Sequence, residues 1–426
     1  MTETELRIRV ARSIAEVPAS AWDACAHAPV LAPSSETSCL APSLKAESLK
    51  VESEDGFSQL STRGYPHNPF ISHDFLFTLE ASKSTGGATG WQPRHLIAEG
   101  SDGTILGVAP CYLKTHSRGE YVFDHGWAEA YEQAGGHYYP KLQVAVPFTP
   151  VTGPRLLVRP GPLADAVRGG LADALVEVTK QGDLSSAHVT FLTKSEWQLL
   201  GWRGFLQRTD QQFHWENAGY ATFEDFLSAL ASRKRKAIRR ERKEALGPGI
   251  EVHWLTGSDL TESVWDSFFE FYMETGSRKW GRPYLTREFF SLIGGKMPQQ
   301  ILLVMAKRAG RWIAGAINFI GAGTVFGRNW GAIEHHPFLH FELCYYQAID
   351  YAIGHGLKRV EAGAQGEHKL ARGYLPSTTY SAHYIGHPGL RRAVAEFLAR
   401  ERAYVEAAGE ALAAAAPFRK DLVEQE

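Results

Sequence analysis

Apolar and polar residues follow two different periods along the chain, which predicts alternating strands and helices. Residues 5–10 alternate charged and apolar positions, as a half-buried strand does, whereas residues 72–80 place apolar side chains at helical spacing. Two more strands are predicted at 93–99 and 105–114, around a Gly-containing turn. The chain therefore begins as an ordinary α/β protein.

The next apolar stretches predict a β-α-β unit. A strand is expected at 152–158, an amphipathic helix at 163–180 and a second strand at 187–192. Such a unit pairs its strands in parallel through a right-handed crossover.

A similar order returns later in the chain. Residues 301–308, 311–320 and 324–330 read as an antiparallel meander with short Gly-containing turns, followed by a helix at 338–353 and a strand at 358–362. The fold class predicted is therefore α/β with mixed sheets (α+β), built from two similar halves.

The repeated order divides the sequence. We expect a first half at 1–210, a second half at 211–387 and a C-terminal helical segment at 388–426. Within the first half, residues 28–64 are rich in Ser, Ala, Pro, Glu and Lys and poor in large apolar side chains. Such a stretch cannot bury enough surface to offset its ordering entropy, so we expect a flexible insertion without chemistry.

Two segments between the halves have a polar character. Residues 194–217 are expected to form a polar connection, and residues 223–245 a single long helix. On that helix, eight of the eleven residues from 233 to 243 are Lys or Arg. A solvated face would carry acids at i,i+4 spacing, and these are largely missing, so recognition of phosphates in tRNA, coenzyme A or a nucleotide-linked sugar is the competing interpretation.

Composition narrows the class of protein. The chain has 426 residues, 44% hydrophobic and 22% charged, and a formal net charge of −2, so a global attraction to nucleic acid or anionic membranes is disfavoured. No run reaches the roughly 18 apolar residues that a membrane span needs. The four cysteines, Cys25, Cys39, Cys111 and Cys344, form no C-x-x-C pair. A metal-free protein of the reducing cytoplasm is expected.

A Gly-rich, charged loop follows the last strand of the second half. Residues 363–373 carry Glu367, His368, Lys369 and Arg372 among three glycines. Glycine permits close approach of a ligand, and these side chains can move protons or stabilise charge. A solvated polar turn is the alternative.

The segment from His116 to Lys141 is dense in aromatic and polar residues, as the lining of a pocket can be. Asp124 beside His125 could orient an imidazole as general base. However, neighbouring side chains on a strand point to opposite faces, so a structural histidine is an equally good interpretation.

Three short motifs bear on ligand binding. Residues 328–333 approach the [QR]-x-x-G-x-[GA] pyrophosphate loop but end in Ile333, and Gly321-x-Gly323 lies in a predicted hairpin, where a dinucleotide fingerprint does not belong. His336 and His340 have the spacing of metal ligands without an evident third one.

Several longer runs are distinctive: Asn68–Phe70, His116–Trp127, Tyr138–Lys141, Pro147–Pro150, Gly327–Gly331, His340–Gln347 and Gly363–Gly373. Together they resemble the Fem-like family labelled peptidoglycan biosynthesis/recognition, predicted N-acyltransferases of the GNAT superfamily. The resemblance covers nearly the whole chain apart from residues 28–64, and it implies a tandem GNAT-like fold of the Fem type.

For the better-understood Fem transferases, the resemblance implies transfer of an aminoacyl group from aminoacyl-tRNA to an amine of a peptidoglycan precursor. We therefore expect an N-acyltransferase that uses a CoA- or tRNA-linked donor and no metal, with tRNA contacting the basic helix. The rival is a non-catalytic GNAT-fold module that binds a cell-wall precursor or RNA. The expected catalytic residues are His368, Glu367, Lys369, Asp124 and His125. The expected substrate-binding residues are Arg372, Arg328, Trp330, Glu342, Tyr345, Trp127, Arg235 and Arg239.

Overall fold

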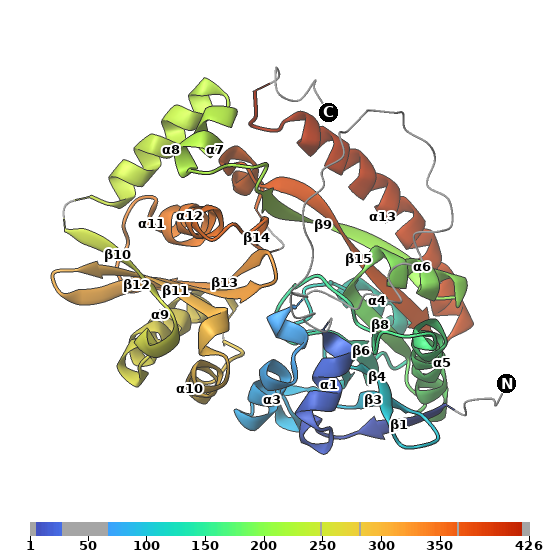
Figure 1. Cartoon of the computed structure of the whole chain (residues 1–426). Helices are drawn as coiled ribbons and strands as arrows, with labels where there is room; N and C mark the ends of the chain where they lie inside the picture. Colours follow the sequence, from blue (N-terminus) through green and yellow to red (C-terminus); the bar gives the residue numbers. More distant parts are fainter. Residues whose placement is uncertain (1–5, 28–66, 248, 281–282, 364–365, 420–426) are drawn as a thin grey trace, which may run out of the picture.

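The computed structural model describes residues 6–27, 67–247, 249–280, 283–363 and 366–419. Its strands form one long mixed sheet and one small sheet, with helices packed against their faces (Figure 1). The expected mixed α/β class is confirmed. The predicted insertion at 28–64 lies outside the described residues.

The two sheets are adjacent in the first half of the chain. Among the described residues, the small sheet has the order β1 (Arg7–Ala11), β3 (His95–Glu99), β4 (Ile105–Ala109) and β7 (Leu157–Val158). The long sheet has the order β10 (Ile250–Leu255), β11 (Ile301–Arg308), β12 (Arg311–Gly321), β13 (Thr324–Ala332), β14 (Arg359–Glu361), β9 (Leu206–Glu216), β15 (Leu375–Ile385), β8 (Ser186–Leu192), β6 (Lys141–Val144), β5 (Cys111–Lys114) and β2 (Trp91–Pro93).

Helices cover both sheets. Those of the first half are α1 (Ala19–Ala26), α3 (His73–Ala81), α4 (His125–Gln133), α5 (Ala164–Gln181) and α6 (Lys194–Trp202). Those of the rest of the chain are α7 (Phe223–Ala229), α8 (Ser232–Ala245), α9 (Glu262–Trp280), α10 (Arg287–Lys296), α11 (Leu339–Phe341), α12 (Gln347–Gly354) and α13 (Pro388–Ala414). A π-helical turn, η6 (Glu342–Tyr346), joins α11 to α12, and a 3-10 helix, η7 (Glu367–Arg372), occupies the Gly-rich loop.

The two halves repeat one topology. In the first, β5 and β6 are antiparallel, α5 follows, and β8 returns parallel to β6. In the second, β12 and β13 are antiparallel, α12 follows, and β14 returns parallel to β13. This is the tandem arrangement expected from the repeated order in the sequence.

The halves then exchange a strand each. β9 follows the first half but pairs with β14, and β15 follows the second half but pairs with β8 (Figure 1). β9 and β15 also pair with each other, which makes the long sheet continuous. The predicted boundary at residue 210 falls inside β9, and the division of the chain into halves at that point stays a prediction.

The polar connection expected at 194–217 is wrong, since α6 and β9 occupy it. Thr193 begins α6 with a capping box that includes Glu196, a signal that the apolar pattern alone missed. β9 is central in the sheet yet carries two polar residues in succession: Asp210 lines a cavity, and the side-chain amide of Gln211 donates to the carbonyl of Val405 in α13 at 2.8 Å. These polar residues interrupt the apolar alternation, so the sequence pattern did not predict the strand.

The single helix expected at 223–245 is also wrong. α7 and α8 are separated by Leu230 and Ala231, whose backbone is extended. The amide of Ala231 donates to the carbonyl of Pro417 at 2.9 Å, so the end of the chain pairs with this break. A contact between residues far apart in sequence therefore ends the helix.

The strands expected in the first half are shorter than predicted because the chain changes sheets. Arg94 separates β2 from β3, and Pro110 separates β4 from β5. Only Leu157–Val158 of the strand expected at 152–158 pairs, while α4 and β6 lie in the aromatic and polar segment. Proline lacks an amide donor, so Pro110 is a natural point for such a change.

Candidate functional site

A cavity of about 490 Å³ lies where the two halves meet. Aromatic side chains from the first half form one wall, and β9 contributes polar groups. The lining residues used below are Tyr121, Phe123, Phe148, Asp210, Asn318, Arg328, Trp330, His340, Cys344, Tyr345 and Lys369.

The cavity opens where two parallel strands diverge. β13 pairs with β14 only from Thr324 to Phe326, although β13 continues to Ala332. Opposite this point, the register between β12 and β13 shifts between Ala316 and Asn318. Beyond Phe326, β13 has no strand partner on this side among the described residues, so its backbone groups can bond to a ligand.

Lys369 is the buried cation of the cavity. Its side chain comes from η7, and its ammonium group donates to the carbonyl oxygens of Ala362 at 2.6 Å and Gly363 at 3.0 Å. Burial lowers the pKa of Lys369 to about 8, with a smaller lowering by Arg328, against an opposing effect of Cys344. An ammonium group with this pKa is suited to stabilising developing negative charge.

Arg328 is the second buried cation. Its side chain is 6% exposed, and its guanidinium lies 4.6 Å from the centre of the Phe70 ring. Two of its nitrogens, Nε and Nη2, have no hydrogen-bond partner among the described residues, and Nη2 lies 4.0 Å from the buried carboxylate of Glu361. Burial lowers the pKa of Arg328 to about 10 against the opposing charge of Glu361.

Tyr345 connects the cavity to His368. The tyrosine hydroxyl lies 3.0 Å from Nε2 of His368, which is exposed, whereas Tyr345 is buried and lines the cavity. Burial raises the pKa of Tyr345, so its hydroxyl stays protonated and can pass a proton without ionising. The structure thus places His368 at the end of a short polar path from the cavity.

The side chains of the Gly-rich loop therefore have two different roles, one at the cavity and one in packing against α8. Lys369 lines the cavity and His368 reaches it through Tyr345, whereas the side chain of Glu367 lies outside the described part of the structure. Arg372 instead bonds to both carboxylate oxygens of Glu241, at 3.0 and 2.9 Å, and lies 3.5 Å from the centre of the Phe341 ring. Arg372 joins η7 to α8 and does not line the large cavity.

The basic helix α8 is partly neutralised. Arg242 pairs with Glu342 and Asp350, Arg239 pairs with Glu224, and Arg235 donates to the carbonyl of Ser228 at 3.4 Å. The two residues expected to bind substrate, Arg235 and Arg239, are thus engaged locally. Four other cations of α8 form no ion pair with any described residue: Arg233, Lys234, Lys236 and Lys243.

Two further residues expected in the cleft lie elsewhere. Glu342 is fully buried and bonds to Arg242 and Gln347, which holds the π-helical turn against α8. Trp127 packs against the guanidinium of Arg208 and the ring of His383 in a small core below α13. Both side chains support the structure around the cavity.

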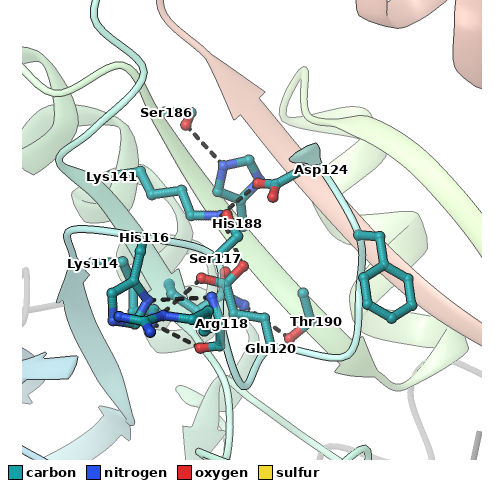
Figure 2. A network of polar contacts seen from close by, with 12 residues as sticks. Lys114, His116, Ser117, Arg118, Glu120, Asp124, Lys141, Ser186, His188 and Thr190 are labelled. Atoms are coloured by element: carbon teal, nitrogen blue, oxygen red, sulfur yellow. Dashed lines mark hydrogen bonds and ion pairs between the residues drawn. The ribbon is translucent and has the colours of Figure 1, made fainter. Parts of the chain in front are cut away.

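A buried ionic cluster in the first half holds Asp124 (Figure 2). Lys141 donates to Ser117 at 2.8 Å, to Glu120 at 2.8 Å and to Asp124 at 2.5 Å. Burial alone would raise the pKa of Asp124, but Lys141 outweighs it and holds that pKa well below its usual range. The carboxylate therefore stays charged.

The expected pairing of Asp124 with His125 is wrong. His125 is exposed at the start of α4, and the carboxylate of Asp124 faces Lys141 and the hydroxyl of Tyr138 instead. The histidine near Asp124 is His188, whose pKa burial lowers to about 3 (Figure 2). The dense polar run in the sequence indicated that polar side chains gather here, but it did not show which of them pair with one another.

The near match to a pyrophosphate loop at 328–333 has a different role. These residues belong mostly to β13 and do not form a strand-to-helix turn. A Cβ at Gly331 would lie 2.0 Å from the backbone oxygen of Phe271, so the glycine is needed where α9 crosses β13. Arg328 and Trp330 nevertheless line the cavity, as expected.

Sequence reasoning missed several residues of the site. Asn318 lines the cavity and is a buried polar side chain inside the apolar run of β12, a signal that could have identified it, whereas Glu361, at the end of the short strand β14, lies 4.0 Å from Arg328. Tyr121 and Phe148 have φ of 60° and 61°, and bulky residues rarely adopt this conformation. Such strain concentrates at functional sites, but backbone angles cannot be read from a sequence.

Comparisons with known proteins agree with the resemblance noted in the sequence. A FemAB-like family model, described as peptidoglycan biosynthesis/recognition, matches residues 13–420. Among solved structures, the chain is similar to FemX, at 12% identity over 82% of this chain and 100% of that chain, with a TM-score of 0.49. It is also similar to L-PGS from Bacillus licheniformis, at 10% identity over 79% and 98%, with a TM-score of 0.47. A tandem GNAT protein of clavulanic acid biosynthesis matches at 12% identity over 90% and 99%, with a TM-score of 0.42. No curated protein matches the chain significantly.

Two searches within the described residues concern metals and membranes. No group of three or more His, Cys, Asp or Glu side chains in this part of the chain could hold a metal ion. No helix in the same ranges is long and apolar enough to cross a membrane.

Proposed function

Because the chain belongs to the FemAB-like family of peptidoglycan biosynthesis/recognition proteins, we propose that it is an N-acyltransferase. It moves an acyl or aminoacyl group from a CoA- or tRNA-linked donor to an amine, with a peptidoglycan precursor as the candidate acceptor. A cytoplasmic location is part of the proposal, since no disulfide joins Cys25, Cys111 and Cys344 in the described part of the chain.

The observation that carries the proposal is the cavity between the diverging strands β13 and β14. Its floor offers unpaired backbone groups, its sides offer two buried cations, Lys369 and Arg328, and Tyr345 leads to His368. An acyl carbonyl placed beside Lys369 would develop negative charge next to a fixed cation, which is the main requirement of acyl transfer.

The residues divide the chemistry as follows. The amine nitrogen bonds to the acyl carbon, the bond to the donor thiol or hydroxyl breaks, and one amine proton must leave. Tyr345 accepts that proton as it passes its own hydroxyl proton to His368, which releases it to solvent. Lys369 and Arg328 stabilise the tetrahedral oxyanion.

Replacing His368 by alanine is expected to lower the transfer rate by about 10²-fold, the lower end of what a proton acceptor contributes. Tyr345→Phe should have a similar effect, since it removes the hydroxyl that joins the cavity to the imidazole. The measurement is mass-spectrometric detection of product from acetyl-CoA or aminoacyl-tRNA and nucleotide-linked muropeptides. His355→Ala, at the exposed histidine that caps the C-terminal end of α12, is the matched control. Unchanged transfer in both cavity variants would remove the proton path from the mechanism.

The second candidate is a binding module without catalysis. It is favoured by one observation: residues 328–332 lie in β13 and do not form the strand-to-helix turn of a pyrophosphate loop. Thermal-shift measurements with acyl-CoAs, aminoacyl-tRNA and nucleotide-linked muropeptides, followed by mass spectrometry, separate the two functions. Stabilisation by a ligand without any transferred group would support the binding module and contradict the enzyme.

The basic surface of α8 supplies a test of the donor. Exchanging the four unpaired cations Arg233, Lys234, Lys236 and Lys243 for glutamine is expected to weaken tRNA binding and to flatten its salt dependence. The slope of log K against log salt should fall by about 0.7–0.9 per lost phosphate contact. The control exchanges four exposed cations elsewhere, Arg7, Lys83, Lys194 and Arg400, with the same change in net charge. Equal slopes for the two variants would assign the α8 cations to a solvated face.

A further inference from the structure

The helical segment after β13 contributes three residues to the lining of the cavity. His340 of α11 and both Cys344 and Tyr345 of the π-helical turn η6 line the cavity. In a regular α-helix, neighbouring residues such as 344 and 345 diverge by about 100°. Residues 344 and 345 nevertheless both line the cavity from a π turn, and such turns occur frequently at functional sites.

Cys344 differs from the other described cysteines in its surroundings. Cys25 and Cys111 are buried in hydrophobic cores, and burial raises the pKa of their thiols to about 11 and about 12. Cys344 is half-buried and lines the cavity. It is therefore the described cysteine that a donor in the cavity can reach.

The groups facing Cys344 favour a thiolate. Lys369 lines the same cavity, and a negative charge on Cys344 would raise the pKa of this lysine against the effect of burial. His340 lies four residues earlier on the same helical segment and also lines the cavity, as a base for a cysteine nucleophile would. Thiolates form where cations and imidazoles surround a partly exposed cysteine.

A second feature of the cavity points independently to a ligand with negative or developing negative charge. Arg328 is a nine-tenths buried cation in its wall, and its Nε and Nη2 have no hydrogen-bond partner among the described residues. The carboxylate of Glu361 lies 4.0 Å away, and Asp210 is an acidic residue that also lines the cavity. A buried guanidinium left in this state is satisfied when a carbonyl oxygen or an anion enters.

We propose that Cys344 accepts the acyl group of a thioester or ester donor before the amine receives it. This inference rests on the proposed function and adds a covalent step to it. The thiolate sulfur bonds to the acyl carbon, the carbon bond to the donor sulfur or oxygen breaks, and the released group takes the proton that His340 removed from the thiol. The amine then bonds to the acyl carbon, the carbon–sulfur bond breaks, and the amine loses one proton through Tyr345 and His368.

The decisive experiment measures the acyl-enzyme. The full-length protein is incubated with phenyl thioacetate, which needs no recognition of a donor, and in parallel with acetyl-CoA, and is then quenched in acid. Intact-mass and peptide mass spectrometry should find one acetyl group on Cys344, removable by neutral hydroxylamine. Cys25 and Cys111 serve as internal controls and should stay unmodified. The adduct should be lost in Cys344→Ala.

A second measurement does not depend on any donor. The rate of alkylation of Cys344 by iodoacetamide is followed against pH, with the expectation of an apparent pKa below about 8.5, the value of a free cysteine. Lys369→Met should shift that apparent pKa upwards by about one unit, because a neighbouring cation is lost. His340→Ala, at a half-buried position, provides a second variant if Lys369→Met does not fold.

The outcomes separate this inference from the proposed function. Acetyl transfer to an amine by Cys344→Ala at the wild-type rate overturns the thioester step and leaves the N-acyltransferase intact. A hydroxylamine-sensitive acetyl on Cys344 without transfer to any amine supports the thioester step and contradicts the N-acyltransferase. Alkylation of Cys344 with an apparent pKa at or above about 8.5 overturns the nucleophile.

Discussion

Replacing Lys141 by methionine is expected to lower the free energy of unfolding by about 3–5 kcal/mol, because it leaves buried charge without its partner. The ammonium group of Lys141 is fully buried and donates to Ser117, Glu120 and Asp124. Methionine keeps most of the side-chain volume, so the change removes charge and hydrogen bonds with little cavity. Denaturant unfolding followed by far-UV circular dichroism measures the effect.

The cluster has a feature that makes the loss of this cation severe. Lys114 is the cross-strand partner of Lys141, so two lysines face two carboxylates inside the sheet. Burial lowers the pKa of Lys114 to about 7, and the charge of Glu120 opposes this shift only in part. For Lys141, burial also acts to lower the pKa, but the charges of Glu120 and Asp124 outweigh it and raise the pKa. Lys141 is thus the cation that stays charged at neutral pH.

Two further variants test this explanation. Adding Asp124→Asn to Lys141→Met should recover part of the lost stability, because the uncompensated carboxylate is removed. Lys180→Met, at an exposed lysine paired with Glu177, should change stability by less than about 0.5 kcal/mol. A loss below about 1 kcal/mol in Lys141→Met would show that the cluster does not depend on this cation.

Replacing Gly331 by alanine is expected to destabilise the protein by about 3 kcal/mol, the upper end for overpacking. The new Cβ would lie 2.0 Å from the carbonyl oxygen of Phe271 and 2.2 Å from its carbonyl carbon. The carbonyl group belongs to the backbone of α9 and the glycine to the backbone of β13, so neither can rotate away as a side chain would. The clash must separate the helix from the sheet.

Gly295→Ala is the matched control for this prediction. A Cβ at Gly295 meets nothing within 4 Å, and the residue is exposed in α10, so the substitution should stabilise by about 0.5 kcal/mol. Thermal and denaturant unfolding of both variants provide the comparison. If Gly331→Ala were as stable as the wild type, α9 would have to pack further from β13 than the structure shows.

The apolar pattern predicted the elements whose period was undisturbed. The meander β11–β13, the helix α5 and the strand β8 appear where the sequence placed them, although only α5 buries a single face, whereas β8 and most of β11 are buried on both faces. The repeated order also predicted the tandem arrangement. The pattern failed at β9 and at the break between α7 and α8, where polar lining and pairing with the C-terminal segment replaced local preference.

The candidate site was predicted in part for a similar reason. The sequence singled out Lys369, Arg328, Trp330 and Tyr345, and all of them line the cavity. Asp124, Glu342 and Trp127 were chosen by the same criterion of polar or aromatic density, yet they pack inside the structure around it. A dense group of polar and aromatic residues requires a particular environment. Burial against a partner side chain and contact with a ligand both provide one, so composition does not distinguish the two.

The sequence by itself determined the class of fold, the repeat of strands, helix and strand, and the charged loop with its Lys369. Only the tertiary structure decided that β9 and β15 change halves, that β13 and β14 diverge, and that His340, Cys344 and Tyr345 turn to one cavity. The physical reason is the range of the interactions involved. Periodicity and turn preference act between residues close in the chain, whereas strand exchange, close helix–sheet contact and buried ion pairs join residues that are far apart in sequence and meet only when the chain has folded.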